Sequence, residues 1–415
     1  MSREKPSVLI FSEMFPKPKS SSSGVFIVER LKALAKLGVP FDFAPVSTFD
    51  SLPIRILKKL KGYSPSVPIE SVQVNQKHYP VLNVSLGLRD RIGLIKQEPS
   101  SWMKYAQGMA SAIEKNKNIE EYCLIHAHRV FPEGYAAMRL SQKYSIPYIV
   151  TAHGGEIHSL SYDFHTLVRE ILRNASRAIF VSNALMKDAC EKLGYDKSNG
   201  IVIPNGVDTN VFKPMDKEEA RRKLSLPLDK KIVGFVGNLI EVKGADRLPA
   251  IARELLKLRS DVFFFIVGDG PLLKTLREKM PGDISHFAGR LEYGLMPMAM
   301  NSIDVLVVPS RQEGFGTVIL EARACGASVV GTNVGGIPEA IGDERLPSSD
   351  SENLSEELAQ RISWIISDEL ELETASYCVS SNDWQEIARR ERDIYEEIIS
   401  ETISLTGSLR PNLCL

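Results

Sequence analysis

Short apolar runs rich in β-branched and aromatic residues alternate along the chain with segments whose apolar residues recur at helical spacing. In the first half these runs are SVLIF at 7–11, CLIHAH at 123–128, PYIVTAH at 147–153 and RAIFVS at 177–182. GVFIVERLKALAKLG at 24–38 has the helical spacing and ends on a glycine. Strands that alternate with helices in this way predict an open parallel sheet covered by helices.

The same alternation restarts after a turn-rich stretch, PNGVDTNVFKP at 204–214. The chain is therefore expected to be an α/β protein with two doubly wound domains, at 1–208 and 209–382. In the C-terminal part, 383–415, an amphipathic pattern over 383–402 predicts a helix, and residues 403–415 are expected to fray. The strands expected in the second domain lie at 231–238, 261–270, 286–290, 304–310 and 327–332.

The composition fits an ordinary globular protein, with 415 residues, 43% of them hydrophobic and 25% charged. Residues 1–208 contain 27 Lys and Arg against 19 Asp and Glu, and the remainder contains 24 against 33. The basic first half is consistent with an anionic membrane surface or acidic substrate, and equally with chance. Nothing in the sequence indicates a nucleic-acid partner.

Five cysteines occur without a C-x-x-C pair, which favours a reducing compartment and no structural zinc. The apolar run near the N-terminus is too short for a signal peptide, and no apolar stretch approaches the roughly 18 residues of a membrane-spanning helix. We therefore expect a cytoplasmic protein that can lie peripherally on the inner face of the membrane.

In open α/β sheets, ligands bind at the carboxyl ends of the strands, so candidate site residues are expected in the loops that follow the predicted strands. The run at 261–270 ends in Gly-Asp-Gly-Pro, which lets a ligand approach backbone N–H groups, although a tight turn explains it equally well. It is not a complete G-x-G-x-x-G, so dinucleotide binding has little support. Lys243, beside Gly244 at a loop–helix junction, suits a phosphate, and an ordinary surface lysine is the alternative.

The stretch PSRQEGFGTVILEARACG at 309–326 places Glu313 and Glu321 on either side of a glycine-rich helix entrance. Thr317 and Glu321 are four residues apart and share one helix face, near backbone N–H groups that attract an anion. A carboxylate on an otherwise apolar helix needs hydrogen-bond donors, which a ribose diol supplies. Glu313 can accept hydrogen bonds from sugar hydroxyls. A solvent-facing Glu321 and a helix-dipole role for Glu313 remain the alternative.

With the spacing E-x7-E from Glu313 to Glu321, the chain resembles the large retaining glycosyltransferase family of GT-B fold, the glycosyl transferases group 1 or family 4. The resemblance runs from Phe15 to about Glu397. Its other motifs are IHAHRVFPEGYAA at 125–137, TAHGGEIH at 151–158, SNAL at 182–185, PNGVD at 204–208, VGN with KG at 236–244, VGDGP at 267–271 and GTNVGGIPE at 331–339.

This resemblance implies two Rossmann-like domains with an interdomain cleft, and a C-terminal helix that crosses back to the first domain. It implies a donor bound mainly by the second domain and an acceptor bound by the first. Glu321 would hold the donor ribose, Glu313 the hydroxyls of the donor sugar, and Lys243 the diphosphate, with His153 over the sugar. The implied catalytic residues are Glu313, His153 and Lys243; donor residues are Gly24, Asn238, Lys243, Gly268, Arg290, Leu291, Glu313, Gly314, Phe315, Gly316, Thr317 and Glu321; acceptor residues are His128, Arg129 and Glu156.

Three positions depart from the family pattern. Asn238 stands where an arginine usually shares the diphosphate with the lysine, so Arg290 or Arg129 would have to supply that charge. Gly24 is a single glycine where two often occur, and Glu156 stands in place of an aspartate. A catalytically inactive relative is an alternative that these departures leave open.

The family's chemistry implies transfer with retention of configuration, by attack on the same face from which the leaving phosphate departs. That phosphate oxygen would take the acceptor's proton, so no metal or other cofactor is expected. Fixed positive potential at Lys243 and at the helix entrance of Gly316 would stabilise the leaving charge. A metal cluster is the alternative for a group of five polar side chains: His126, His128, His153, Glu156 and His158.

The segment 51–67 places four basic residues among leucines and isoleucines, so a basic amphipathic helix is expected to dock on an anionic membrane; an ordinary surface helix is the alternative. The basic residues are Arg55, Lys58, Lys59 and Lys61. We expect a hexosyltransferase that uses a UDP- or GDP-linked sugar and a lipid-linked or polysaccharide acceptor of the cell surface. The alternatives are a small soluble acceptor, a nucleotide-sugar epimerase and a non-enzymatic sugar-binding module.

Overall fold

The computed structural model describes residues 8–17, 24–60, 66–343, 345–367 and 380–406. The chain divides into two compact units. Unit 1 comprises Met1–Ile203 and Ile387–Leu415, and unit 2 comprises Pro204–Glu386. Each unit contains its own parallel sheet, as the alternating pattern predicted, and each is described by itself.

Unit 1 is built on a seven-stranded sheet in which every adjacent pair of strands is parallel, in the order β5-β2-β1-β6-β7-β8-β9. The four strands predicted in this half are confirmed as β1, β6, β7 and β8. The bounds are β1 (Val8–Ser12), β2 (Phe41–Asp50), β5 (Leu82–Leu86), β6 (Leu124–His128), β7 (Tyr148–Ala152), β8 (Arg177–Phe180) and β9 (Gly200–Val202).

Strand β2 contains a proline, Pro45, although proline cannot donate to a sheet ladder. The register explains how the sheet tolerates it. Residues 41–45 of β2 pair with β1, and residues 46–50 pair with β5. Pro45 lies where β2 changes partners, so its missing N–H falls at the join between the two ladders.

The helices of unit 1 follow its strands and cover the sheet, and a two-stranded antiparallel hairpin, β3 (Ser71–Val74) with β4 (Lys77–Pro80), lies beside them. The predicted helix at 24–38 is confirmed as α1 (Val25–Lys36). The others are α2 (Leu52–Leu60), α3 (Leu88–Ile95), α4 (Pro99–Asn116), η1 (Ile119–Glu121), α5 (Glu133–Tyr144), α6 (Gly155–His158), η2 (Tyr162–Phe164), α7 (His165–Asn174) and α8 (Asn183–Leu193).

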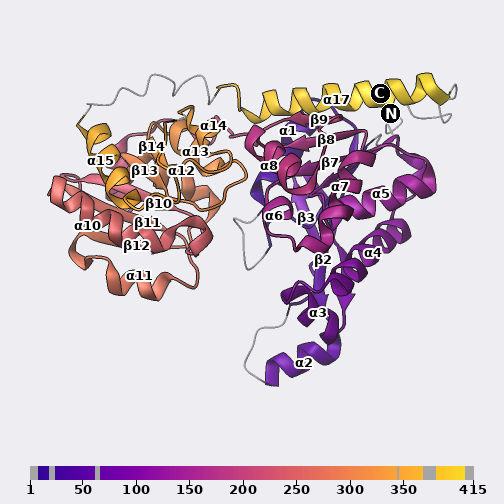
Figure 1. Cartoon of the computed structure of the whole chain (residues 1–415), viewed down its shortest axis with the longest axis horizontal. Helices are drawn as coiled ribbons and strands as arrows, with labels where there is room; N and C mark the ends of the chain where they lie inside the picture. The colour runs from indigo at the N-terminus through magenta and orange to yellow at the C-terminus, as the bar shows by residue number, and fades with distance from the viewer. Residues whose placement is uncertain (1–7, 18–23, 61–65, 344, 368–379, 407–415) are drawn as a thin grey trace. The chain divides into compact units, whose positions relative to one another are not determined.

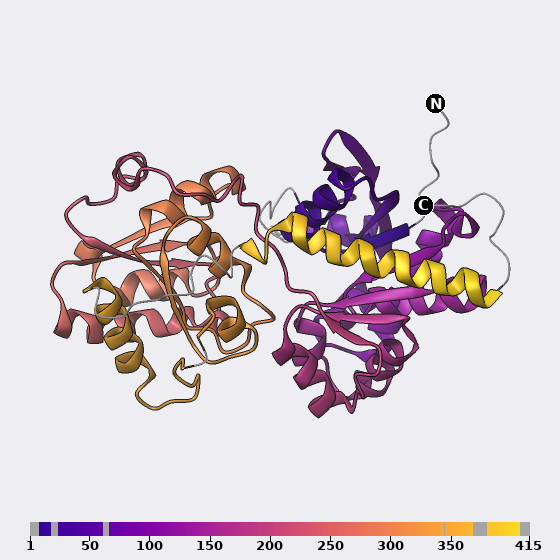
Figure 2. The ribbon, with the colours of Figure 1, turned by 90° about the horizontal axis from the view of Figure 1, so that it is seen from above.

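The C-terminal helix α17 (Trp384–Thr406) lies along unit 1, as Figures 1 and 2 both show. Its Glu391 forms a buried ion pair with Arg30 of α1, and Arg390 donates to the carbonyl of Val202 at the end of β9. This confirms the predicted helix that returns to the first domain. The predicted end at residue 402 is wrong, because the helix continues to Thr406; residues 407–415, which we expected to fray, lie outside the described residues.

Unit 2 contains a five-stranded parallel sheet in the order β12-β11-β10-β13-β14, and all five predicted strands are confirmed. The strands are β10 (Lys231–Val236), β11 (Val262–Val267), β12 (Ser285–Gly289), β13 (Val305–Val308) and β14 (Ser328–Gly331). The helices are α9 (Lys217–Lys223), η3 (Glu241–Lys243), η4 (Ala245–Arg247), α10 (Leu248–Leu258), α11 (Leu273–Lys279), η5 (Gly282–Ile284), η6 (Tyr293–Leu295), α12 (Met296–Ser302), α13 (Thr317–Ala324), α14 (Ile337–Ile341) and α15 (Leu354–Ile366).

Alternate residues of the strands face a core formed with α10, α11 and α15, in which Phe264, Val305 and Leu358 are buried. Helices α13 and α14 contact the sheet at β13 and β14. Burial on both faces explains why the strands are continuous apolar runs rather than alternating ones. The loops that leave the carboxyl ends of the strands therefore carry the polar residues. Within the described part of the chain, no helix has the length and apolarity to cross a bilayer.

Candidate functional site

In unit 2 the loops that follow β10, β11 and β12 lie directly on one another. A Cβ atom on Gly268, whose φ is +140°, would lie 1.8 Å from the carbonyl oxygen of Gly237, so only glycine fits there. The Gly268 amide donates to the carbonyl of Gly289 at 2.8 Å. This stack brings together the segments that carry three sequence-predicted donor residues: Asn238, Arg290 and Leu291.

Two further predicted residues, Lys243 and Glu313, form an ion pair. Lys243 Nζ lies 2.6 Å from Glu313 Oε2, although the two residues are 70 positions apart. Gly244 allows this approach, because a Cβ there would lie 1.8 Å from the carbonyl oxygen of Pro309, in the loop that leads to Glu313. Each charge is thus held by the other at the carboxyl ends of β10 and β13.

Arg247, which was not among the predicted site residues, holds the same junction. Arg247 donates to the carbonyl oxygens of Pro309 and Ser349, at 2.8 Å in each case. The sequence feature that could have indicated this arginine is its position, four residues after Lys243 and at the start of the next helix. Arg247 therefore ties the loop after β13 to the Lys243 segment.

Helix α13 begins directly after the Gly-Phe-Gly turn. Gly316 is its N-cap residue in a left-handed conformation (φ +85°), and no side chain caps the first turn. Phe315 is buried and anchors the turn, so Thr317 starts the helix at a fixed place. Backbone N–H groups at such a helix start attract an anion.

Glu321 lies one turn further along α13. Among the described residues its carboxylate has neither a hydrogen-bond partner nor an ion-pair partner, and burial raises its pKa to about 7. The residue is only partly buried, and an unpaired carboxylate of this kind is one that a ligand with two hydroxyl donors would satisfy.

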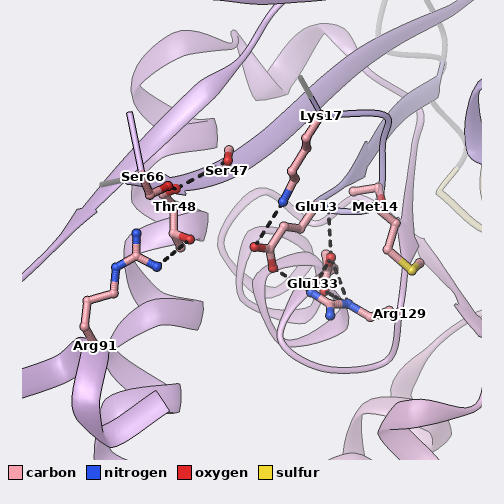
Figure 3. A network of polar contacts seen from close by, with 10 residues as sticks. Glu13, Met14, Lys17, Ser47, Thr48, Ser66, Arg91, Arg129 and Glu133 are labelled. Carbon is pink, nitrogen blue, oxygen red and sulfur yellow. Dashed lines mark hydrogen bonds and ion pairs between the residues drawn. The ribbon is translucent and has the colours of Figure 1, made fainter. Parts of the chain in front are cut away.

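In unit 1 the loops after β1 and β6 meet at Arg129, as Figure 3 shows. The guanidinium donates to both carboxylate oxygens of Glu133 and lies 2.9 Å from Glu13 Oε2. Lys17 lies 3.7 Å from the same Glu13. Arg129 has φ +102°, which is unusual for a residue with a side chain. The structure therefore uses Arg129 to join two loops, and its acceptor role stays a prediction.

His153, at the end of β7, packs against Phe26 of α1, with ring centroids 5.0 Å apart. Its Nε2 lies 3.3 Å from Nδ1 of His128, so two predicted residues are in contact. Burial holds the pKa of each imidazole well below its usual range, so both rings are neutral at physiological pH. Gly24, the N-cap of α1, has φ +72° and lies against the backbone of Phe15.

Glu156 is buried and accepts a 2.8 Å hydrogen bond from the His153 amide, and a longer one from the Val130 amide. Burial raises the pKa of this carboxyl, although the amides oppose the shift. These contacts hold the loop that carries His153; binding of an acceptor by Glu156 stays a prediction.

Two residues of the alternative metal cluster, His126 and His128, lie near Glu391, and the possible ligand atoms of the three are within 4.8 Å of one another. Arg30 Nη1 lies 3.2 Å from Glu391, and this buried positive charge opposes a cation. Both nitrogens of His126 are also occupied, by Tyr395 and Thr151. His158 pairs instead with Asp188.

Comparisons with known proteins place this geometry in a family. The model described as glycosyl transferases group 1 matches residues 216–394, and the one described as glycosyltransferase family 4 matches 79–211. TuaC of Bacillus subtilis (strain 168), a glycosyltransferase named for teichuronic acid biosynthesis, is 30% identical over 347 residues, covering 81% of this chain and 83% of TuaC. The chain belongs to the group 1 glycosyltransferases.

Another relative of this glycosyltransferase, the N-acetyl-α-D-glucosaminyl L-malate synthase of Bacillus anthracis, is 28% identical and spans 78% of this chain and 79% of its own length. Among solved structures, the sucrose-phosphate synthase of Thermosynechococcus elongatus has a TM-score of 0.75 at 20% identity, covering 96% of this chain and all of that one. HepE of Anabaena, in complex with UDP, has a TM-score of 0.68 at 20% identity, with 94% and 100% covered. The glycosyltransferase therefore has the GT-B fold.

A first prediction concerns the unpaired carboxylate of Glu321. Its pKa is about 7 in the folded protein, against 4.5 ordinarily, so its neutral form stabilises the fold below pH 4.5. That contribution is lost as pH rises through about 7. We expect Glu321→Gln, which cannot ionise, to be more stable than wild type at pH 8, by on the order of 1–2 kcal/mol, and to lose that advantage by pH 4.5. Urea unfolding at several pH values measures this; a difference independent of pH would contradict it.

A second prediction concerns the backbone that holds Glu313. Gly335 has φ +51°, and a Cβ there would lie 1.8 Å from the Glu313 carbonyl oxygen. Gly326 also has a positive φ, +86°, but its Cβ would meet nothing within 4 Å. We expect Gly326→Ala to cost about 1 kcal/mol in unfolding free energy from backbone strain alone, and Gly335→Ala a further ~1–3 kcal/mol because it displaces the Glu313 loop. Urea unfolding compares them, and equal losses would show that this contact is unimportant.

Proposed function

We propose that this glycosyltransferase moves a hexose from a nucleoside-diphosphate sugar, with retention of configuration, to a lipid-linked or polysaccharide acceptor of the cell surface. The observation that carries the proposal is the meeting of Lys243 and Glu313 in unit 2, together with the uncapped start of α13 and the unpaired Glu321. The cation and the backbone N–H groups match the diphosphate of the sugar donor, and the two carboxylates match its sugar and ribose hydroxyls.

The diphosphate is the most highly charged part of the donor. Lys243 already pairs with Glu313, and an incoming diphosphate would compete for the ammonium. Once Lys243 turns to phosphate, the Glu313 carboxylate is free to accept hydrogen bonds from sugar hydroxyls. The backbone around Gly316 and Thr317 would then add positive potential at the leaving phosphate.

Glu321 is assigned to the donor ribose. Two adjacent hydroxyls can satisfy its carboxylate, which has no partner within the described residues. Asn238, which stands where the family usually has an arginine, is exposed and carries no charge. Arg290, exposed in the neighbouring loop, is the residue that we propose supplies the second positive charge. Base contacts would come from the backbone around Gly289 and Leu291.

For the reaction we propose attack on the same face of the sugar that the phosphate leaves. The acceptor oxygen forms a bond to the anomeric carbon as the bond from that carbon to the phosphate oxygen breaks. The acceptor's proton passes to the departing phosphate oxygen, so the charges balance without an enzyme nucleophile. Lys243 stabilises the leaving diphosphate, and His153, as a neutral imidazole, positions the sugar.

We propose that this step requires no metal. Lys243 and the start of α13 supply the positive charge for which a cation would otherwise be needed. The relatives support the donor and acceptor classes. HepE, with the same fold, has been solved with UDP and with UDP-glucose, and TuaC is named for teichuronic acid biosynthesis.

We further propose that α2 and α3 dock this enzyme on an anionic membrane from the cytoplasmic side. On α2, Leu52, Ile56 and Leu60 are each more than half exposed and recur every fourth residue. On α3 the exposed apolar side chains are Leu88, Ile92 and Ile95. Figure 1 shows both helices at the same end of unit 1.

Basic side chains lie on the same surface, and the buried Asp50 links its two helices. Asp50, at the end of β2, pairs with Lys58 of α2 at 2.9 Å and with Arg91 of α3 at 3.2 Å. Arg91 also donates to Thr48 (Figure 3). Lys58 is therefore partly neutralised, and Lys61 lies outside the described residues; Arg55 and Lys59 remain to meet anionic lipid.

A third prediction tests the donor assignment. We expect Glu313→Gln to lower kcat by roughly a hundredfold while the Kd for UDP changes little, because the amide keeps the size but loses the charge. Glu321→Ala should instead raise the Kd for UDP by roughly tenfold or more, since it removes charged hydrogen bonds. Transfer from UDP-glucose and GDP-mannose, together with calorimetry of UDP and GDP binding, measures both effects.

The matched control is Glu278→Gln, an exposed glutamate on α11, which should behave as wild type. NMR of the product reports the anomeric configuration. An inverted product would refute retention, and near-wild-type values for both site variants would refute the roles given to the two glutamates. Full activity in EDTA is expected, and loss of activity that Mg²⁺ restores would refute the metal-free step.

A fourth prediction tests docking. Removing two basic residues in Arg55→Ala/Lys59→Ala should weaken binding to vesicles that contain anionic phospholipid by about 30-fold, because each contributes ~1 kcal/mol at such a surface. Ile56→Asn/Ile95→Asn should weaken it by removing buried apolar area. Co-sedimentation with vesicles measures both. Leu258→Asn, at an exposed leucine of α10 in unit 2, is the control; unchanged binding in both double variants would show that this surface does not dock.

A further inference from the structure

The C-terminal helix α17 places two polar side chains in the interior of unit 1. Glu391 and Tyr395, one turn apart, are 0% and 1% exposed. Glu391 forms a 3.2 Å ion pair with Arg30 of α1, which is equally buried. A buried carboxylate is costly unless a cation faces it, so Arg30 accounts for the presence of Glu391. It does not account for Tyr395, whose hydroxyl has a second contact.

That contact is His126, which is held at both ring nitrogens. Nδ1 lies 2.6 Å from the Tyr395 hydroxyl and 3.3 Å from Glu391 Oε1, and Nε2 lies 2.7 Å from the Thr151 hydroxyl. Tyr395 donates its proton to Glu391 Oε1 at 3.2 Å, so its oxygen presents a lone pair to Nδ1. His126 therefore carries its proton on Nδ1, and Thr151 donates to Nε2.

The ring of His126 is neutral, because burial, and then the charge of Arg30, lowers its pKa well below the usual range. It packs on the ring of His128, with centroids 4.3 Å apart. His128 in turn meets His153, with 3.3 Å between Nδ1 and Nε2. Three imidazoles thus lead from α17 to the end of β7.

Two nitrogens of this series have no partner among the described residues: Nε2 of His128 and Nδ1 of His153. Because the facing nitrogens of these neutral rings share one proton, the tautomer of His128 fixes that of His153. The ring of Phe26 also packs against that of His153. Whether Nδ1 of His153 is a donor or an acceptor therefore depends on the buried rings of His128 and His126.

We propose that Glu391 and Tyr395 are positioning residues for His153, acting through His126 and His128. Helix α17 holds one tautomer of His126, and the dipole of that fixed ring favours one tautomer of His128, whose ring centroid lies 4.3 Å away. His153 then presents a single edge to the donor sugar. The inference rests on the proposed function only for the role of His153 toward the sugar; the chain of contacts lies entirely within unit 1.

The test is Tyr395→Phe, which removes the hydroxyl and keeps the ring. Long-range ¹H–¹⁵N spectra of the full-length protein labelled with ¹⁵N-histidine report each tautomer, with His153 assigned from His153→Gln. We expect the wild-type His126 to show the Nδ1–H tautomer, and Tyr395→Phe to mix its tautomers and shift the signals of His153. Tyr162→Phe, at an exposed tyrosine of unit 1, should leave both histidines unchanged.

In activity assays Tyr395→Phe should lower kcat roughly tenfold, with the KM for the donor within about twofold of wild type. This loss is smaller than the roughly hundredfold loss expected when a group that contacts the reacting atoms is itself misplaced. Glu391→Gln should act in the same direction, and Glu396→Gln, at an exposed position of the same helix, should not. Glu391→Gln also removes the partner of Arg30, so the melting temperatures of the variants are compared. Tyr395→Phe keeps that ion pair and is therefore the deciding variant.

Unchanged His153 signals in folded Tyr395→Phe, or a wild-type kcat, would overturn the proposal. A wild-type protein that transfers no sugar from any nucleotide donor would overturn the proposed function instead. In that case the His153 signals alone decide whether α17 orders the imidazoles, so the two failures are distinguishable.

Discussion

The ion pair of Lys243 with Glu313 is the contact on which the unit 2 site depends. It joins the loop after β10 to the loop after β13, at a distance of 2.6 Å, and glycine at 244 lets the two backbones touch. The pairing means that neither charge is desolvated alone before a ligand binds. A ligand that separates the two side chains must therefore replace the ion pair, with an anion for the lysine and hydroxyl donors for the carboxylate.

The same principle governs unit 1, where most buried charges are already matched. Arg129 is enclosed by Glu13 and Glu133, and Arg30 by Glu391. Two of the groups that lack a partner among the described residues bear on the proposed site. Glu321 has no partner, and Nδ1 of His153 has none either. Both of these groups are among those that we assign to the ligand.

Much of the fold followed from the sequence because the strands are buried on both faces. Continuous apolar runs rich in β-branched and aromatic residues identified nine strands. Strands β2, β5 and β9 of the unit 1 sheet were not predicted. In β2, Pro45 interrupts the pattern and lies where the strand passes from β1 to β5. The end of α17 was also misplaced, since the polar residues near 402 continue the helix on the surface of unit 1.

The sequence by itself determined the chemistry that is available: the types of residue at the strand ends, the E-x7-E spacing from Glu313 to Glu321, and the four-residue spacing that places Thr317 and Glu321 on one helix face. Local periodicity is enough for that, since one helix turn relates those residues. Only the tertiary structure decided which groups meet. Lys243 reaches Glu313 across 70 residues, and Tyr395 reaches His126 across 269, through loops and a returning helix that no local pattern encodes. Long-range packing sets these distances, so the partners of each charge became visible only in the folded chain.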